Sequence, residues 1–132
     1  MVDIDLRVRY AETDQMGVAY YANYLVWFEV GRGEFCRAKG FDYAKLESLG
    51  YRLVVTDAHC HYRNSARYDE LMTVRTWLKA VHKRMITFGY QILRKEGERE
   101  QLIAEGETRH LNVDFNGTPK SLPKEFFDLL SQ

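Results

Sequence analysis

The stretch of sequence that decides the fold is RVRYAETDQMGVAYYANYLVWFE, which covers residues 7–29. It predicts a short strand over residues 6–10, a polar loop centred on Asp14, and a helix over residues 23–39 that begins with Asn23 as its N-cap and ends before Gly40. Large apolar side chains recur along this helix at spacings of three and four, which is typical of a helix with one buried face: they are Tyr24, Trp27, Phe28 and Phe35.

Two glycines inside the predicted helix, Gly31 and Gly33, each lower helix stability by about 1 kcal/mol relative to Ala. We therefore expect the helix to lie closely against other backbone, as it would at the centre of a surrounding sheet. A second, short helix is expected to begin at Asp42 and to stop at Gly50.

Four further strands are predicted over residues 51–62, 70–81, 85–94 and 102–115, mostly joined by short turns. A final helical turn or two is expected over residues 123–130. Consecutive strands joined in this way pair antiparallel, and one helix must cover their apolar face. The sequence therefore predicts an α+β fold, a five-stranded antiparallel sheet around one long helix, in a single domain over residues 1–132.

The composition excludes several classes of protein. The 132 residues contain 19 basic and 19 acidic side chains, a balance that indicates neither nucleic acid nor a membrane surface as a partner. Cys36 and Cys60 lack metal-type spacing, and the acidic N-terminus lacks the apolar run of a signal peptide. No segment is long and apolar enough to span a membrane. We expect a cytoplasmic protein.

Asp14 has two interpretations. In the first it caps its own loop as an Asx turn, a common role for Asp beside Thr and Gly. In the second it is a catalytic carboxylate, because it lies a few residues ahead of a helix N-terminus whose unpaired N–H groups can hold a developing oxyanion. Tyr24 and Trp27 are expected in the core, whereas Tyr20 and Tyr21 precede the helix and could line a pocket.

Other candidate groups give weaker signals. His59 and His61 share a strand face, but no third metal ligand accompanies them, so no metal site is expected. His110 is expected to be structural. Lys83 and Arg84 form a basic turn, which is either an ordinary solvated turn or a contact for the phosphate groups of a cofactor-sized thioester.

Over residues 7–24 the chain resembles the 4-hydroxybenzoyl-CoA thioesterase branch of the hotdog-fold acyl-CoA thioesterases, through the motif Arg7-Val8-x4-Thr13-Asp14-x2-Gly17 followed by Tyr20-Tyr21-x2-Tyr24. A looser likeness, over residues 53–58, 66–71, 74–76 and 104–108, extends it to nearly the whole chain. The resemblance implies the hotdog fold, a sheet wrapped around one long helix, which agrees with the topology expected above.

The resemblance further implies hydrolysis of an acyl-CoA to a free acid and coenzyme A, without a metal or redox cofactor. Asp14 would be the catalytic carboxylate, either as a base that activates water or as a nucleophile. Tyr21 matches the position whose backbone N–H polarises the thioester carbonyl, although many members of the branch have His there. The substrate-binding residues that the resemblance implies are Gly17, Val18, Tyr20, Lys83 and Arg84.

The resemblance also implies a homo-oligomer, a dimer or tetramer in which two sheets join edge to edge and cover edges that would otherwise be exposed. Two other functions compete with hydrolysis. A hotdog dehydratase would use a His base, and none of the four histidines lies in the motif stretch. A non-catalytic acyl-CoA sensor would need a separate partner protein, because no residues remain for a DNA-binding segment. The sequence leaves open the acyl group, the choice between coenzyme A and acyl carrier protein, and the pathway.

Overall fold

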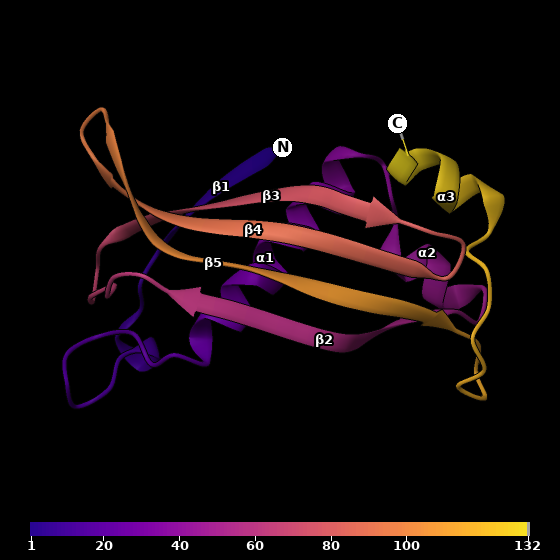
Figure 1. The fold of residues 1–132 in the computed structure, drawn as a ribbon, viewed down its shortest axis with the longest axis horizontal. Coiled ribbons are helices and arrows are strands. Elements are labelled where there is room, and N and C mark those ends of the chain that lie inside the picture. Colours follow the sequence, from indigo (N-terminus) through magenta and orange to yellow (C-terminus); the bar gives the residue numbers. More distant parts are fainter. Residues whose placement is uncertain (132) are drawn as a thin grey trace.

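The computed structural model describes residues 1–131, and within them five strands form one antiparallel sheet in the order β1-β3-β4-β5-β2 (Figure 1). The strands are β1 (Val2–Arg7), β2 (Arg52–Tyr62), β3 (Leu71–Val81), β4 (Met85–Glu96) and β5 (Arg99–Val113). The helices are α1 (Asn23–Ala38), α2 (Tyr43–Ser48) and α3 (Lys124–Ser131), with a 3-10 turn η1 (Tyr10–Glu12) ahead of α1. No helix among these residues is long and apolar enough to cross a bilayer. The predicted α+β class and the five antiparallel strands are confirmed.

The core lies between α1 and one face of the sheet. In Figure 1 α1 and α2 lie behind the sheet, and α1 contacts β1, β2, β3 and β4. Because side chains alternate along a strand, β4 turns one set of residues toward the helix, and all of them are buried: Ile86, Phe88, Tyr90 and Ile92. Phe28 of α1 stacks on Tyr90, with the ring centroids 4.3 Å apart and the rings nearly parallel.

The two glycines of α1 differ in their surroundings. A Cβ on Gly31 would lie 2.6 Å from Val74 Cγ1 and closer still to the hydroxyl of Thr76, so this helix turn lies directly against β3. A Cβ on Gly33 would meet only the Arg37 guanidinium, at 3.6 Å, which is ordinary contact. At Gly31 the helix therefore lies close to β3, but against side chains rather than the expected backbone, and the expectation is wrong at Gly33.

The ends of several elements differ from the prediction. The first strand is Val2–Arg7 rather than residues 6–10, because the chain turns into η1 at Tyr10, whose carbonyl accepts a hydrogen bond from Thr13 N–H. The β4–β5 hairpin is longer than expected, since Glu96 pairs with Arg99 and leaves a turn at Gly97 with a φ of +64°. Gly40, with a φ of +77°, follows the end of α1 as predicted.

Candidate active site

The loop between β1 and α1 closes around Asp14. Asp14 N–H donates to Val18 O and Gly17 N–H donates to Asp14 O, each at 3.0 Å, and Gly17 takes the left-handed backbone conformation that glycine allows. Asp14 Oδ1 accepts a hydrogen bond from Met16 N–H at 2.8 Å. The Asx turn is therefore present. Asp14 Oδ2 accepts no hydrogen bond within residues 1–131, so this oxygen is available for chemistry.

The N-terminus of α1 offers unpaired donors beside this loop. Ala22, with helical φ and ψ angles, is the N-cap residue, and the predicted N-cap Asn23 is instead the first residue of the helix. The N–H groups of Tyr21 and Ala22 donate to no group within residues 1–131. Tyr21 is nevertheless fixed, because its carbonyl accepts hydrogen bonds from Tyr62 Oη at 2.9 Å and from Tyr24 N–H at 3.3 Å.

Glu12 ties the loop to the helix and was missed by the sequence analysis. Its side chain is buried, and it accepts hydrogen bonds from Trp27 Nε1 at 2.8 Å and from Arg9 N–H at 2.7 Å. The Glu12 carbonyl accepts hydrogen bonds from Asn23 Nδ2 and from Tyr20 N–H. Burial alone would raise the pKa of the Glu12 carboxyl, but these donors hold that pKa below its usual value. No local pattern indicates a contact between residues fifteen positions apart.

Aromatic side chains surround the start of α1. Tyr24 and Trp27 are buried, as predicted, whereas the rings of Tyr20 and Tyr21 are exposed and lie with their centroids 4.6 Å apart. The neighbouring Tyr21 phenol, and less strongly the Asp14 carboxylate, raise the pKa of Tyr20.

A second loop, residues 63–70, lies against the Asp14 loop. Ala19 N–H donates to Ala66 O at 2.8 Å, Val18 pairs with Arg67 as an isolated antiparallel bridge, and Ala66 N–H donates to Tyr24 Oη at 3.3 Å. These bonds place residues 66–67 of the second loop beside the candidate site.

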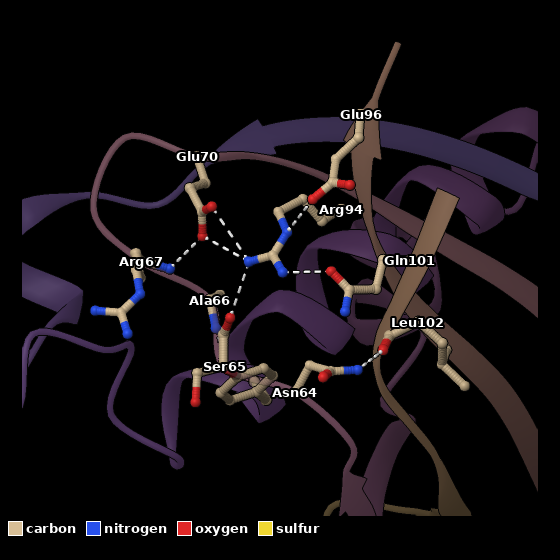
Figure 2. Close-up of polar contacts among 10 residues, drawn as sticks. Asn64, Ser65, Ala66, Arg67, Glu70, Arg94, Glu96, Gln101 and Leu102 are labelled. Atoms are coloured by element: carbon tan, nitrogen blue, oxygen red, sulfur yellow. Dashed lines mark hydrogen bonds and ion pairs between the residues drawn. The ribbon is translucent and has the colours of Figure 1, made fainter. Parts of the chain in front are cut away.

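Arg94 of β4 holds the second loop in place through several hydrogen bonds (Figure 2). Its Nη1 donates to Ser65 O at 3.0 Å and to both oxygens of Glu70, at 3.0 and 3.2 Å, and its Nη2 donates to Gln101. Glu70 also accepts Arg67 N–H at 2.6 Å. The bonds of Arg94 therefore fix both ends of the segment that pairs with residues 18–19.

Lys83 and Arg84 lie elsewhere. They form the turn between β3 and β4, at the end of the sheet opposite the Asp14 loop (Figure 1). Their carbonyls accept hydrogen bonds from Leu122 N–H and Asn112 N–H. Within one chain the structure brings together five of the predicted site residues, Asp14, Gly17, Val18, Tyr20 and Tyr21, but it does not bring Lys83 and Arg84 to them.

A cavity of about 770 Å³ opens at the far end of α1, between α1, α2 and the sheet. His110 lines it and is buried, with Nε2 2.8 Å from Thr108 Oγ1. Burial, and then the charge of Arg32, lower the pKa of His110 to about 4, so the ring is neutral at pH 7. Burial raises the pKa of Cys36, which also lines the cavity, to about 11. The burial and hydrogen bond of His110 fit the structural role predicted for it, which stays a prediction. Within residues 1–131 no three His, Cys, Asp or Glu side chains gather as a metal site requires.

Comparison with known proteins identifies the class. Residues 8–130 match the model of the thioesterase-like superfamily. The chain belongs to this superfamily and is a thioesterase. The chain is 35% identical to a putative esterase of Aquifex aeolicus strain VF5 (94% of this chain, 93% of the relative) and 39% identical to the putative acyl-CoA thioesterase YneP of Bacillus subtilis strain 168 (83% and 78%).

Solved structures agree with this assignment. The DHNA-CoA thioesterase of Staphylococcus aureus superposes with a TM-score of 0.87 at 34% identity, over 96% of this chain and 83% of that one. A 4-hydroxybenzoyl-CoA thioesterase superposes with a TM-score of 0.86 at 15% identity, over 98% and 97%, and this shows a shared fold alone. The thioesterase assignment and the hotdog fold are confirmed, while the specific 4-hydroxybenzoyl-CoA branch stays a prediction.

Proposed function

We propose that the protein hydrolyses the thioester of a small acyl-CoA, with a short aliphatic or an aromatic acyl group, to the free acid and coenzyme A. One observation carries the proposal: a carboxylate with a free oxygen, Asp14, and a rigid backbone with a free N–H, Tyr21, lie on the same short loop at the start of α1. The similarity to the putative acyl-CoA thioesterase YneP supports the acyl-CoA class.

In the proposed mechanism the Tyr21 N–H donates to the thioester oxygen as it becomes an oxyanion. One such donor typically contributes about 3–4 kcal/mol in the transition state. Asp14 acts in one of two ways. As a base it takes a proton from water, hydroxide adds to the carbonyl, and the tetrahedral intermediate expels the coenzyme A thiolate, which takes up that proton. As a nucleophile it forms an acyl-aspartyl anhydride and releases the thiolate, and water then hydrolyses the anhydride. Neither route uses a metal or a redox cofactor.

We further propose that two copies assemble through β2. This strand is one edge of the sheet and is largely exposed. Antiparallel pairing about its middle would bring Tyr62, which holds Tyr21, next to Leu53 of the second copy, and Leu53 lines the 770 Å³ cavity. Each catalytic loop would then face the other copy's cavity, with α1 as the central helix of a wrapped sheet and Gly17, Val18 and Tyr20 around the carbonyl.

The remaining proposals concern the whole chain. Lys83 and Arg84 would contact the carrier's phosphates from the second copy, since they lie far from Asp14 in their own. We propose one hotdog domain over residues 1–132. We propose the cytoplasm as its location, because Cys36 and Cys60 are free thiols, as expected in a reducing compartment.

The test is thiol release from a panel of acyl-CoA esters, with Asp14→Asn compared to wild type. Losing a positioned base or nucleophile should lower kcat by about 100-fold or more, with the fold and the oligomer unchanged. Asp114→Asn is a matched control, because Asp114 forms the same turn: its Oδ1 accepts Asn116 N–H, its N–H donates to Thr118 O, and its carbonyl accepts Gly117 N–H. The control should leave kcat unchanged.

Two results would contradict the proposal. An equal fall of kcat in Asp14→Asn and Asp114→Asn would mean that Asp14 only stabilises its loop. Tight binding of an ester that wild type does not cleave would favour a non-catalytic acyl-CoA sensor, a role compatible with the Asx turn of Asp14.

A further inference from the structure

Arg67 lies beside the catalytic loop. Its main chain pairs with Val18, and a Cβ on Gly17 would be 3.8 Å from the Arg67 Nη1. Gly17 closes the turn that holds Asp14. The Arg67 guanidinium is therefore a positive charge at the rim of the loop, in the same chain as Asp14.

This guanidinium has no partner in the part of the chain that the structure describes. Arg67 is exposed, and its side chain forms no hydrogen bond or ion pair within residues 1–131. Neighbouring arginines are engaged: Arg63 pairs with Glu105 at 3.6 Å, Arg7 donates to Asp69 O at 2.8 Å, and Arg9 pairs with Glu12 at 3.4 Å. The charge of Arg67 is thus available to a ligand.

Glu70, three residues further along the chain, is directed elsewhere. Both of its oxygens accept hydrogen bonds from Arg94, and Oε1 also accepts the main-chain N–H of Arg67. In Figure 2 the guanidinium of Arg67 points away from this cluster. The Glu70–Arg94 pair therefore fixes the backbone of Arg67 while leaving its side chain unpaired.

We propose that Arg67 binds a phosphate group of the carrier that delivers the acyl chain to Asp14. The inference rests on the proposed thioesterase function. A guanidinium binds phosphate oxygens through two parallel, charge-assisted hydrogen bonds, whereas a thioester or an acyl chain gives it no anion to bind. Such a contact would act from the same chain as Asp14, in contrast to the distant Lys83 and Arg84.

The test varies the substrate and the protein together. One acyl group is presented on coenzyme A, on 4′-phosphopantetheine and on pantetheine, which lacks phosphate. For Arg67→Gln we expect KM for the coenzyme A ester to rise about tenfold with kcat unchanged. KM for the pantetheine ester should stay as in wild type. Arg67→Lys should raise KM for the coenzyme A ester less than Arg67→Gln does. Arg63→Gln, from the same loop, should leave KM for both esters unchanged.

The phosphate arms identify the source of the contact. If Arg67→Gln raises KM for both the coenzyme A and the 4′-phosphopantetheine esters, Arg67 contacts the phosphate next to pantetheine. An acyl carrier protein also has that phosphate. If KM rises for the coenzyme A ester alone, Arg67 contacts the more distant phosphates of coenzyme A. Either result supports the proposal.

Other results overturn it. Equal changes of KM for the coenzyme A and pantetheine esters would show that Arg67 acts through the loop alone, and an unchanged KM for all three would show no contact. If wild type cleaves none of the esters, the proposed function fails separately. Calorimetric titration of coenzyme A into wild type and Arg67→Gln then decides, because equal affinities, or no binding to wild type, would refute the role of Arg67.

Discussion

His110 and Glu12 are both buried and ionisable, but His110 is neutral and Glu12 is charged. His110 remains neutral because it is buried and faces the positive Arg32, while its Nε2 shares a hydrogen bond with Thr108. Glu12 remains charged because Trp27 and the Arg9 main chain donate to it. Glu12 connects the loop to α1, whereas the hydrogen bond of His110 stays within β5, and neither side chain has a part in the proposed chemistry.

The lowered pKa of His110 predicts a pH dependence of stability. Between pH 6.5 and pH 4 the unfolded chain takes up a proton on this ring and the folded chain does not, so the free energy of unfolding should fall as the pH falls through this window. The shift from 6.5 to about 4 corresponds to roughly 3 kcal/mol. Urea denaturation of wild type and His110→Gln at pH 7, 5.5 and 4 measures it.

The difference between the two proteins isolates His110 from carboxylates that titrate in the same window. On acidification from pH 7 to pH 4, the free energy of unfolding of His110→Gln should fall by roughly 3 kcal/mol less than that of wild type. Parallel pH profiles for wild type and His110→Gln would contradict a low pKa for this ring.

Individual site residues were predictable from the sequence only where they lie close together along the chain. Asp14, Gly17 and Tyr21 lie on one loop, so their order relative to a helix start was visible. Glu12 and Arg94 were not, because their partners Trp27 and Glu70 are 15 and 24 residues away and come close only in the folded chain. Tertiary hydrogen bonds of this kind leave no period in the sequence.

At the scale of the element, α1 is positioned by one glycine. Gly31→Ala would push a methyl group into Val74 and Thr76 of β3. Overpacking typically costs about 1–3 kcal/mol, which outweighs the gain of about 1 kcal/mol in helix propensity. We expect Gly31→Ala to lower the free energy of unfolding, measured by urea denaturation at a fixed protein concentration.

Gly33→Ala is the matched change, two residues further along the same helix. Its methyl group would meet only Arg37 at ordinary contact distance, so helix propensity should dominate and the variant should be as stable as wild type or up to about 1 kcal/mol more stable. The same loss in both variants would mean that the contact with β3 does not decide the cost.

Helix α1 and the sheet show what periodicity predicts well. The helix expected over residues 23–39 is Asn23–Ala38, because its apolar spacing extends through its whole length. Strand ends were less accurate: the strand expected over residues 102–115 is Arg99–Val113. Strands end where a partner ends, and cross-strand pairs such as Glu96 with Arg99 depend on the neighbouring strand rather than on local sequence.

At the scale of the whole molecule, the two edges of the sheet are unequal. At the β1 edge, Asp3 forms an ion pair with Arg75 at 2.9 Å and Asp5 forms one with Lys95 at 3.2 Å. Charged side chains on a short edge strand discourage pairing with another chain. The β2 edge has 11 residues and exposed valines, and α1 beside it exposes Leu25, Val26 and Val30. These features favour β2 as the contact between copies.

Two adjacent valines of β2 test this contact. Val54 and Val55 are exposed to similar extents, 45% and 47%, but side chains alternate along a strand. Val55 therefore lies on the face of Leu53, toward the cavity and α1, and Val54 lies on the opposite face. In sedimentation experiments, we expect wild type to sediment as the proposed β2-linked dimer and Val55→Glu as a monomer, because the substitution would bury an unpaired charge between copies. Val54→Glu should leave the β2 contact intact.

Activity should follow the oligomeric state. If the catalytic loop of one copy faces the cavity of the other, the Val55→Glu monomer should retain its circular dichroism spectrum but lose thioester hydrolysis, while Val54→Glu stays active. A monomeric and fully active Val55→Glu would mean that Asp14 and Tyr21 are sufficient within one chain. The acyl group would then bind in its own subunit, and the cavity at the far end of α1 would have no part in the reaction.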